Sequence, residues 1–393
     1  MSRPAAALAV AVLLLLAACG GGADDPPSTG GDTTASARPE GPAPQPVVDG
    51  ARLLDARTGQ PWLPRGVNWS GFEYACAQGW GYSPLEGRGT DPAAAQAALL
   101  AAAGIDAVRL PLNQDCWLGT RGAPAGIAAD GSARTPEGYR AEVAAFVTAL
   151  HARGMAVVLD LQSRKREGQQ EFGNVAMPDA DSLRFWSQVA AAYANDPSVL
   201  FDAFNEPYAR YDAAGRLVFE LTWSCWRDGG CTPPVRDDRE APTNATYPAV
   251  GMAAVVAAIR DAGARQPIVL GGLDYANDLR GWLEHRPDDD QLVAAVHAYD
   301  FKRCADESCW DAEWAPVAAQ APLLLGEVGA TDPAAGDFVP RVLGWAADHG
   351  SGALLWVWSA TDDPMSLTTG LDGTPSGYGR EAAGWLRTGR WEG

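Results

Sequence analysis

The sequence predicts a (β/α)8 TIM barrel that forms a single catalytic domain. Short apolar runs alternate with segments of helical periodicity, as expected for strands that alternate with helices. Each run is apolar throughout, which is typical of parallel strands buried on both faces. No glycine-rich phosphate loop follows the first run, so an open doubly wound sheet is disfavoured. Eight runs suit a closed barrel, and they cover residues 63–69, 105–112, 155–161, 199–204, 267–270, 292–296, 322–325 and 353–358.

Two of the intervening segments carry clear helix signals. The first starts at Thr135-Pro136, where proline suits the first helical turn, and stops at Gly154. The second starts at about Asp181 and stops near Asn195. Both segments place their large apolar side chains on one stripe, which predicts amphipathic helices.

The N-terminal residues 1–19 are expected to be a targeting segment. One positive charge, at Arg3, precedes an apolar stretch over 5–18 that is too short to span a bilayer as a helix. The stretch ends in Leu16-Ala17-Ala18-Cys19, which resembles the lipobox of bacterial lipoproteins. We therefore expect a secreted protein that lipid on Cys19 anchors at the cell surface, on the outer face of the cytoplasmic membrane. The alternative is a conventional signal-peptide cleavage site, with Cys19 there by coincidence.

After the lipobox the chain divides into a tether and a catalytic domain. Residues 20–46 are rich in Gly, Ser, Thr and Pro and hold almost no large apolar residues, which predicts a flexible linker. Residues 47–393 are the predicted barrel. A segment of this length could also hold two ordinary domains, but the alternation of strands and helices favours one.

Charge and cysteine content limit the class of function. The net charge of −19 argues against binding of nucleic acid and against electrostatic docking on anionic lipid. Six cysteines follow Cys19, an even number that suits disulfides in an oxidising compartment. Their spacing lacks the short pattern of a zinc site, and we expect neither metal nor cofactor. The expected bridges are Cys225–Cys231 and Cys304–Cys309, with Cys76–Cys116 as the remaining pair.

Polar residues that close an apolar run are the candidates for chemistry, because the active sites of such barrels collect at the C-terminal ends of the strands. The fourth run ends in Asn205-Glu206-Pro207, and the seventh ends in Glu327. A retaining glycosidase needs two carboxyl groups about 5–5.5 Å apart, one as acid and one as nucleophile. A lone glutamate is more often a surface charge or an ion-pair partner. Two glutamates at two strand ends predict a catalytic pair.

Other polar residues at the strand ends make the pattern more specific. An arginine lies in the second run, a histidine and a tyrosine close the sixth, and a tryptophan ends the eighth. In this order the residues resemble glycoside hydrolase family 5, the cellulase family, over roughly residues 47–390. The resemblance rests on Arg65-Gly66-Val67-Asn68, Arg109, Asn205-Glu206-Pro207, His297, Tyr299, Glu327 and Trp358.

The resemblance implies a role for the residues of this set. Glu206 would be the acid/base and Glu327 the nucleophile, and hydrogen bonds from Arg109 and Tyr299 would keep Glu327 ionised. Glu206 would lie beside a negative neighbour that holds its proton until the sugar esterifies Glu327. Asn205, beside the acid/base, would hydrogen-bond the 2-hydroxyl of the sugar.

Three further positions are assigned with an alternative. His297 would orient Glu206 or meet the substrate, unless it is a buried structural histidine. Trp358 is predicted to form the floor under the reacting sugar, because sugar C–H groups pack on an indole face. Trp356 is the competing candidate and is expected deeper in the barrel. Gln162 follows the third run where the family has histidine, and its amide would meet a sugar hydroxyl with some change in rate or substrate preference.

These residues predict a retaining endo-β-1,4-glucanase that acts on cellulose-like or mixed-linkage glucan. Another β-glycan hydrolase, acting on mannan, xyloglucan or β-1,3-glucan, is the first alternative, since one barrel hosts all these activities by loop variation. A non-catalytic glycan-binding surface lipoprotein is the second alternative, suggested by Gln162 and the lipid tether. We expect a monomer whose partners are the polysaccharide and, through Cys19 alone, the membrane.

Overall fold

The computed structural model describes residues 41–165, 172–236, 245–359 and 363–391. The predicted signal peptide, Cys19 and most of the predicted linker lie outside the described residues. Within the described ranges, no helix is both long and apolar enough to cross a membrane. The first described strand begins at Pro46, one residue before the predicted start of the catalytic domain.

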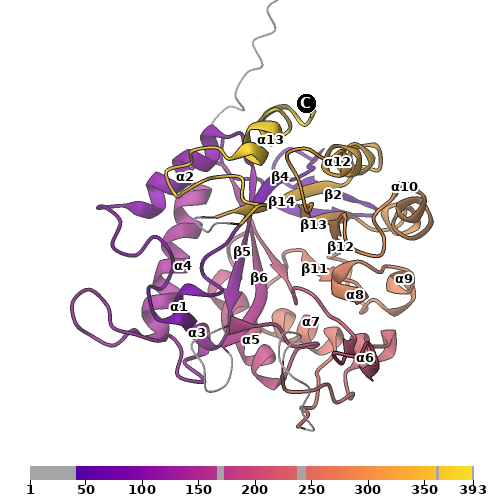
Figure 1. The fold of residues 1–393 in the computed structure, drawn as a ribbon, viewed down its shortest axis with the longest axis horizontal. Helices are drawn as coiled ribbons and strands as arrows, with labels where there is room; N and C mark the ends of the chain where they lie inside the picture. The colour runs from indigo at the N-terminus through magenta and orange to yellow at the C-terminus, as the bar shows by residue number, and fades with distance from the viewer. Residues whose placement is uncertain (1–40, 166–171, 237–244, 360–362, 392–393) are drawn as a thin grey trace, which may run out of the picture. The chain divides into compact units, whose positions relative to one another are not determined.

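Eight parallel strands close into a barrel, which confirms the predicted fold class (Figure 1). Around the barrel the strands run in the order β5-β4-β14-β13-β12-β11-β8-β6, and β5 pairs with β6 to close the ring. Each strand overlaps one of the predicted apolar runs. The strands are β4 (Arg65–Trp69), β5 (Ala107–Asn113), β6 (Ala156–Lys165), β8 (Val199–Asp202), β11 (Ile268–Gly271), β12 (Leu292–Tyr299), β13 (Leu323–Gly329) and β14 (Gly352–Trp358).

Helices surround the barrel (Figure 1). Helix α4 (Pro136–His151) begins where predicted, because the Thr135 side chain accepts a hydrogen bond from the backbone N–H of Gly138. Helix α5 (Ala180–Tyr193) begins one residue earlier than predicted, since Asp179 and Ser182 form a capping box. The other long helices are α2 (Pro92–Ala102), α7 (Met252–Asp261), α12 (Phe338–Asp348) and α13 (Gly377–Thr388).

Short helices and strands lie in the connections. The strands β9 (Arg210–Tyr211) and β10 (Leu217–Phe219) form a hairpin after β8, and β7 (Phe172–Gly173) pairs with the end of β6. The short helices are α1 (Ala75–Gln78), α3 (Gln114–Leu118), α6 (Trp223–Asp228), α8 (Leu273–Ala276), α9 (Trp282–His285), α10 (Glu307–Cys309), a π-helical turn (Trp310–Trp314) and α11 (Ala315–Ala318).

A three-stranded antiparallel sheet precedes the barrel, and the apolar runs do not predict it. Its strands are β1 (Pro46–Asp49), β2 (Arg52–Asp55) and β3 (Gln60–Pro61). Leu53 and Trp62 pack onto apolar side chains near the first residues of the barrel strands. This cluster, called the barrel floor below, closes the N-terminal end of the barrel. Its barrel members are Ala107, Ala156, Val158, Leu200, Val269, Val293, Ala295, Leu324 and Leu354.

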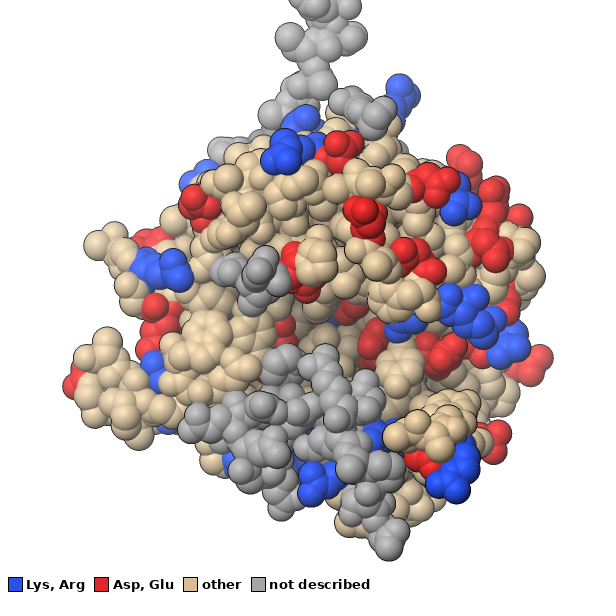
Figure 2. Space-filling view, viewed as in Figure 1, with Lys and Arg blue, Asp and Glu red and all other residues tan. Residues whose placement is uncertain are grey.

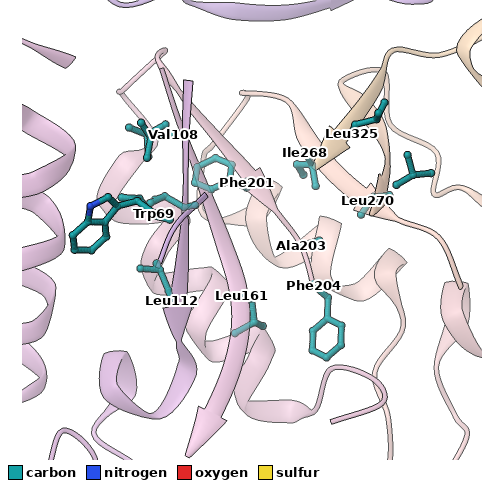
Figure 3. Packing of buried hydrophobic residues seen from close by; sticks show 14 of the residues in the cluster. Trp69, Val108, Leu112, Leu161, Phe201, Ala203, Phe204, Ile268, Leu270 and Leu325 are labelled. Carbon is teal, nitrogen blue, oxygen red and sulfur yellow. The ribbon is translucent and has the colours of Figure 1, made fainter. Parts of the chain in front are cut away.

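The opposite faces of the same strands pack against the helices. Val108, Phe201 and Ile268 belong to this outer core (Figure 3). The indole of Trp69 contacts the ring of Phe146, with 4.6 Å between the ring centroids. Because both faces of the strands are buried, the strands read in the sequence as unbroken apolar runs.

Six cysteines form the three expected disulfides. Cys76–Cys116 joins α1 to α3, so it links the chain after β4 to the chain after β5. Cys225–Cys231 and Cys304–Cys309 each close a short loop, after β8 and after β12. All three bridges therefore restrain connections that leave the C-terminal ends of barrel strands.

Candidate active site

The candidate site lies at the C-terminal ends of the barrel strands, where the inward side chains become polar. Strand alternation continues the inward row from the barrel floor, so Arg109 follows Ala107 and His297 follows Ala295. Glu327 joins this row through a bulge, because the pairing of β12 with β13 skips Gly326 and sets Glu327 opposite His297. The polar inward side chains, all buried, are Asn68, Arg109, Asp160, Asp202, His297 and Glu327.

Glu327 receives the two hydrogen bonds that the family resemblance implies. Arg109 Nη1 donates to its Oε1 at 2.9 Å, and the Tyr299 hydroxyl donates to its Oε2 at 2.6 Å. Both donors are themselves buried, on β5 and on β12. One donor on each oxygen fixes the orientation of the Glu327 carboxylate.

Arg109 is the charge centre beneath the pair of glutamates. Its guanidinium is fully buried and donates to Asp202 at 2.8 Å, while Asp160 Oδ1 lies 3.0 Å from Nη2 without hydrogen-bond geometry. Burial lowers the pKa of Arg109, but the carboxylates of Asp160, Asp202 and Glu327 raise it well above its usual range. Burial in turn raises the pKa of Asp160 and of Asp202, and Arg109 opposes that shift.

Glu206 and Glu327 share His297 as a neighbour. His297 Nδ1 lies 2.9 Å from Glu206 Oε1 and 3.4 Å from Glu327 Oε2. One oxygen of each carboxylate and one nitrogen of the imidazole all lie within 4.8 Å of one another. This short separation is closer to the spacing of a retaining pair, at about 5–5.5 Å between carboxyl groups, than to that of an inverting pair, at about 6.5–9.5 Å.

Glu206 also has a cationic neighbour, Lys302, which the sequence did not indicate. Lys302 Nζ donates to Glu206 Oε1 at 3.1 Å and to the backbone oxygen of Tyr275 at 3.1 Å. Burial raises the pKa of Glu206, but Lys302 and His297 outweigh burial and lower that pKa to about 2. The expectation that a negative neighbour keeps the proton on Glu206 is therefore wrong for the free protein.

The two amide side chains of the predicted set lie beside Arg109. Asn205 Oδ1 accepts a hydrogen bond from Arg109 Nη2 at 2.8 Å, so the amide nitrogen is oriented as a donor. Gln162 is half-buried, and its Oε1 lies 3.5 Å from Arg109 Nη1, at the limit of a hydrogen bond. Neither amide exchanges protons in acid–base chemistry, so both are suited to binding.

The two tryptophans at the end of β14 face different ways, and Trp358 is the wrong choice for a sugar floor. Trp358 is 5% exposed and packs in the outer core, where its Nε1 donates to the side-chain oxygen of Gln96 in α2 at 2.9 Å. Leu354 lies in the barrel floor, so alternation turns Trp356 inward one level higher, where it is only half-buried. The register of β14 against β4 shifts between Leu355 and Trp358, which ends the alternation.

A buried acid, Glu73, is a second residue near the site that sequence reasoning missed. The Ser70 hydroxyl and the Gly71 N–H donate to its two carboxylate oxygens. Burial nevertheless raises the pKa of Glu73 to about 7. Glu73 and Lys302 both lie in connections rather than at the end of an apolar run, so their positions could not be found from strand patterns.

The molecular surface has a hollow over the barrel (Figure 2). Figure 2 shows a hollow near the centre of one face, close to where β6 and β11 lie in Figure 1, and acidic side chains are visible in it. A parallel barrel with two close carboxylates at its C-terminal mouth, one of them fixed by arginine and tyrosine, defines the class of (β/α)8 glycoside hydrolases.

Comparison with known proteins identifies the family. A family profile described as cellulase, glycosyl hydrolase family 5, matches residues 58–362. The chain belongs to this family and is a glycoside hydrolase, and retention of configuration is the family's standard mechanism. A comparison with curated proteins gives no match.

Solved structures with the same fold include enzymes for two kinds of β-glycan. A β-glucanase from Saccharophagus degradans is 18% identical with a TM-score of 0.63, over 92% of this chain and 97% of that chain. The catalytic domain of an endoglucanase from Thermobifida fusca is 16% identical with a TM-score of 0.58, over 88% and 96%. A β-mannanase from Streptomyces thermolilacinus is 19% identical with a TM-score of 0.55, over 88% and 95%. Identities this low show the shared fold alone.

Proposed function

We propose that this protein is a secreted endo-β-1,4-glucanase that works by double displacement, with Glu327 as nucleophile and Glu206 as acid/base. The observation that carries the proposal is the Glu327 carboxylate, which Arg109 and Tyr299 orient and which lies within 4.8 Å of Glu206. Membership of the cellulase family supports the reaction class. A glycan-binding protein without activity would have no use for this shell of donors around one carboxylate.

In the first step, Glu327 attacks the anomeric carbon and Glu206 gives its proton to the glycosidic oxygen. The bond from the anomeric carbon to that oxygen breaks, and the leaving sugar departs with the proton. The Asn205 amide nitrogen, oriented by Arg109, is suited to donate to the 2-hydroxyl, a contact that strengthens in the transition state. Trp356 replaces Trp358 as the surface under the reacting sugar.

In the second step, water replaces Glu327 on the same carbon, and Glu206 acts as the base that takes a proton from that water. The two inversions together retain the configuration of the sugar. The second step needs Glu206 ionised, and Lys302 and His297 favour that form. The first step needs Glu206 protonated, so the environment of Glu206 has to change between the free enzyme and the substrate complex.

The choice of β-glucan rests on two supports. The matching family profile is described as cellulase, and the S. degradans β-glucanase has a structure in complex with cellotetraose. β-Mannan is the second candidate, because a β-mannanase with mannohexaose has the same fold. Gln162 also gives this chain an amide where the family has an imidazole, which suits a sugar with a different hydroxyl pattern.

Hydrolysis of a panel of soluble glycans tests the proposal. We expect turnover of carboxymethyl-cellulose or barley β-glucan above glucomannan, xyloglucan and laminarin, and loss of turnover in Glu206→Ala and Glu327→Gln. Preferred hydrolysis of glucomannan would assign the mannan alternative. A wild-type protein that binds these glycans but cleaves none of them would contradict the proposed function.

We also propose that lipid on Cys19 anchors the enzyme at the cell surface. The support is the lipobox-like Leu16-Ala17-Ala18-Cys19, followed by a tether rich in small and polar residues. The full-length protein is expected in the membrane fraction of a bacterial host, and Cys19→Ala is expected to abolish that fractionation. Equal membrane recovery of both forms would contradict the anchor.

A further inference from the structure

Lys302 places a cation directly on the acid/base. Its Nζ contacts Glu206 Oε1 and the backbone oxygen of Tyr275, each at 3.1 Å, and lies 4.7 Å from the centroid of the Tyr275 ring. The Lys302 side chain is 13% exposed, so a carboxylate, a carbonyl and an aromatic ring replace most of its water. This position is not part of the catalytic set predicted from the sequence.

The backbone around Tyr275 is built to keep this carbonyl in place. Three successive residues other than glycine, Asp274, Tyr275 and Ala276, have φ of 55°, 57° and 57°. Such left-handed conformations are costly for these residues and persist only where the surrounding structure enforces them. The N–H of Tyr275 donates to the backbone oxygen of Pro207 at 2.9 Å, which ties the strained turn to the residue after Glu206.

The ammonium of Lys302 contacts both the acid/base and the ring of Tyr275. An acid that protonates the glycosidic oxygen has the leaving sugar beside it, on the side away from the nucleophile. The ring of Tyr275 is half-buried and stacks on Tyr208 with 4.7 Å between centroids and 2° between planes. A rigid aromatic ring beside the acid is a surface on which the apolar face of a sugar packs. In the free protein Lys302 lies over that ring.

We propose that Lys302 gates the acid/base: its ammonium holds Glu206 as a carboxylate in the free enzyme, and the first sugar of the leaving group displaces it. The proposal rests on the proposed glycosidase function. Once the ammonium has moved into the solvent, Glu206 takes up a proton from the bulk solvent and passes it to the glycosidic oxygen as the glycosidic bond breaks. When the leaving sugar departs, Lys302 returns and stabilises Glu206 as the base for the second step. Glu206 then releases the proton of the attacking water to the solvent, which restores the carboxylate of the free enzyme.

The other groups that face Glu206 do not perform this switch. Buried contacts fix His297 and Tyr299 on β12 and Glu327 on β13. Hydrogen bonds to the carboxylates of Asp202 and Glu327 fix Arg109 on β5. The negative charge of Glu327 repels the carboxylate form of Glu206, whereas His297 stabilises that form. Only Lys302, among these described groups, reaches Glu206 on a flexible stem from the connection after β12.

The kinetic test compares two substrates with the same cellobiosyl group, methyl β-cellobioside and cellotetraose. The measured reactions are the release of methanol from methyl β-cellobioside and cleavage of the central bond of cellotetraose. Both leaving oxygens need a proton, but only the central bond of cellotetraose has, on its leaving side, a sugar that can displace Lys302. In Lys302→Met we expect kcat/KM for methyl β-cellobioside to rise about tenfold at pH 7, with the basic limb of its pH profile moved up by about one unit or more. For cellotetraose, the kcat/KM of Lys302→Met is expected to differ from that of the wild type by less than about threefold. Lys302→Arg is expected to keep the wild-type pH profile for both substrates. A methyl β-cellobioside profile that does not move, or equal shifts for both substrates, would overturn the gate.

A direct titration of Glu206 separates the gate from the proposed function. Protein labelled with ¹³C in its glutamate carboxyl groups is titrated by NMR, and Glu206→Gln assigns the Glu206 signal. We expect the Glu206 signal to titrate at least about one pH unit higher in Lys302→Met than in the wild type. Equal midpoints would overturn the gate even in an active enzyme. A shifted midpoint in a protein that cleaves no glycan would support the part of the gate in which Lys302 holds Glu206 as a carboxylate, and would reject the glucanase function.

Discussion

The two ends of the barrel interior use the same strands and are equally buried, yet they differ in chemistry. At the barrel floor, Ala107, Leu200 and Leu324 point inward and pack under Trp62. At the mouth, the corresponding inward positions carry charged and polar side chains, of which Arg109 has no exposed surface. Burial of apolar surface stabilises the floor, at about 25 cal/mol per Å². Burial of charges at the mouth is unfavourable unless each charge finds partners.

This contrast teaches that burial at the mouth serves the orientation of charges rather than stability. Arg109 meets three carboxylates, and Glu327 receives a donor on each oxygen. Fixed donors in a site with little water stabilise developing charge without reorganisation during the reaction. Substitutions at the mouth should therefore change activity first, and substitutions at the floor should change stability first.

The largest effect is expected for Arg109→Met, which removes the cation at the mouth and keeps an unbranched side chain. Three buried carboxylates then lack their compensating charge, so we expect more than a ~1000-fold loss of kcat/KM and a loss of about 3–5 kcal/mol in the free energy of unfolding. Initial rates measure kcat/KM, and urea denaturation measures the free energy of unfolding. Arg109→Lys keeps the charge without the planar guanidinium, so its kcat/KM and its unfolding free energy should lie between those of Arg109→Met and those of the wild type. Activity within tenfold of wild type in Arg109→Met would contradict the claim that the buried charges at the mouth orient the catalytic groups.

The two tryptophans of β14 sharpen the comparison, because one faces the mouth and the other the outer core. Trp356→Ala should lower kcat/KM by about 10–100-fold with little change in unfolding free energy, since it removes a sugar surface. Trp358→Ala should instead cost about 3–5 kcal/mol of stability. Parallel kinetics and denaturation of both variants test this pair. If Trp358→Ala lowered activity and Trp356→Ala lowered stability, Trp358 would instead be the residue under the sugar.

A substitution in the barrel floor should lower stability without the loss of activity expected for Arg109→Met. Leu200→Ala leaves a cavity among apolar neighbours, and we expect a loss of about 2–5 kcal/mol in the free energy of unfolding. At temperatures where the variant stays folded, kcat should lie within about twofold of the wild type. Loss of kcat in a fully folded Leu200→Ala protein would mean that floor and mouth are coupled.

The smallest effect concerns the pH dependence of stability near the mouth. Burial raises the pKa of Glu73 to about 7, so the folded state holds this proton more tightly than the unfolded chain does. The contribution of Glu73 to stability is therefore greatest below about pH 4.5 and falls as pH rises to about 7, by at most about 3 kcal/mol. Unfolding free energies measured from pH 4 to 8 should decline less in Glu73→Gln than in wild type. Identical slopes would contradict the buried, proton-binding state of Glu73.

The sequence was sufficient to predict most of the fold because the barrel strands are buried on both faces. The eight apolar runs match the barrel strands, and Thr135 and Gly154 bracket α4 as expected. The sheet β1–β3 could not be predicted in the same way, because its strands are short and half exposed and so carry no continuous apolar signal.

The site was predictable where it follows strand ends and not where it depends on bulges or connections. The contacts of Arg109 and Tyr299 with Glu327 are those that the family resemblance implied. The choice between Trp356 and Trp358 failed because a register shift reverses the facing of the second tryptophan. Lys302 was missed because its place beside Glu206 is set by the path of a connection, and no spacing in the sequence encodes that path.

Trapping of the covalent intermediate tests most directly that the mouth holds a retaining pair. The mature domain is incubated with 2,4-dinitrophenyl 2-deoxy-2-fluoro-β-cellobioside, whose fluorine slows the second step, and its peptides are analysed by mass spectrometry. We predict one fluorocellobiosyl group on the peptide that contains Glu327, and none in Glu327→Gln. Label on a different carboxylate, or steady turnover of glucan with release of the inverted sugar and no label, would contradict Glu327 as the nucleophile.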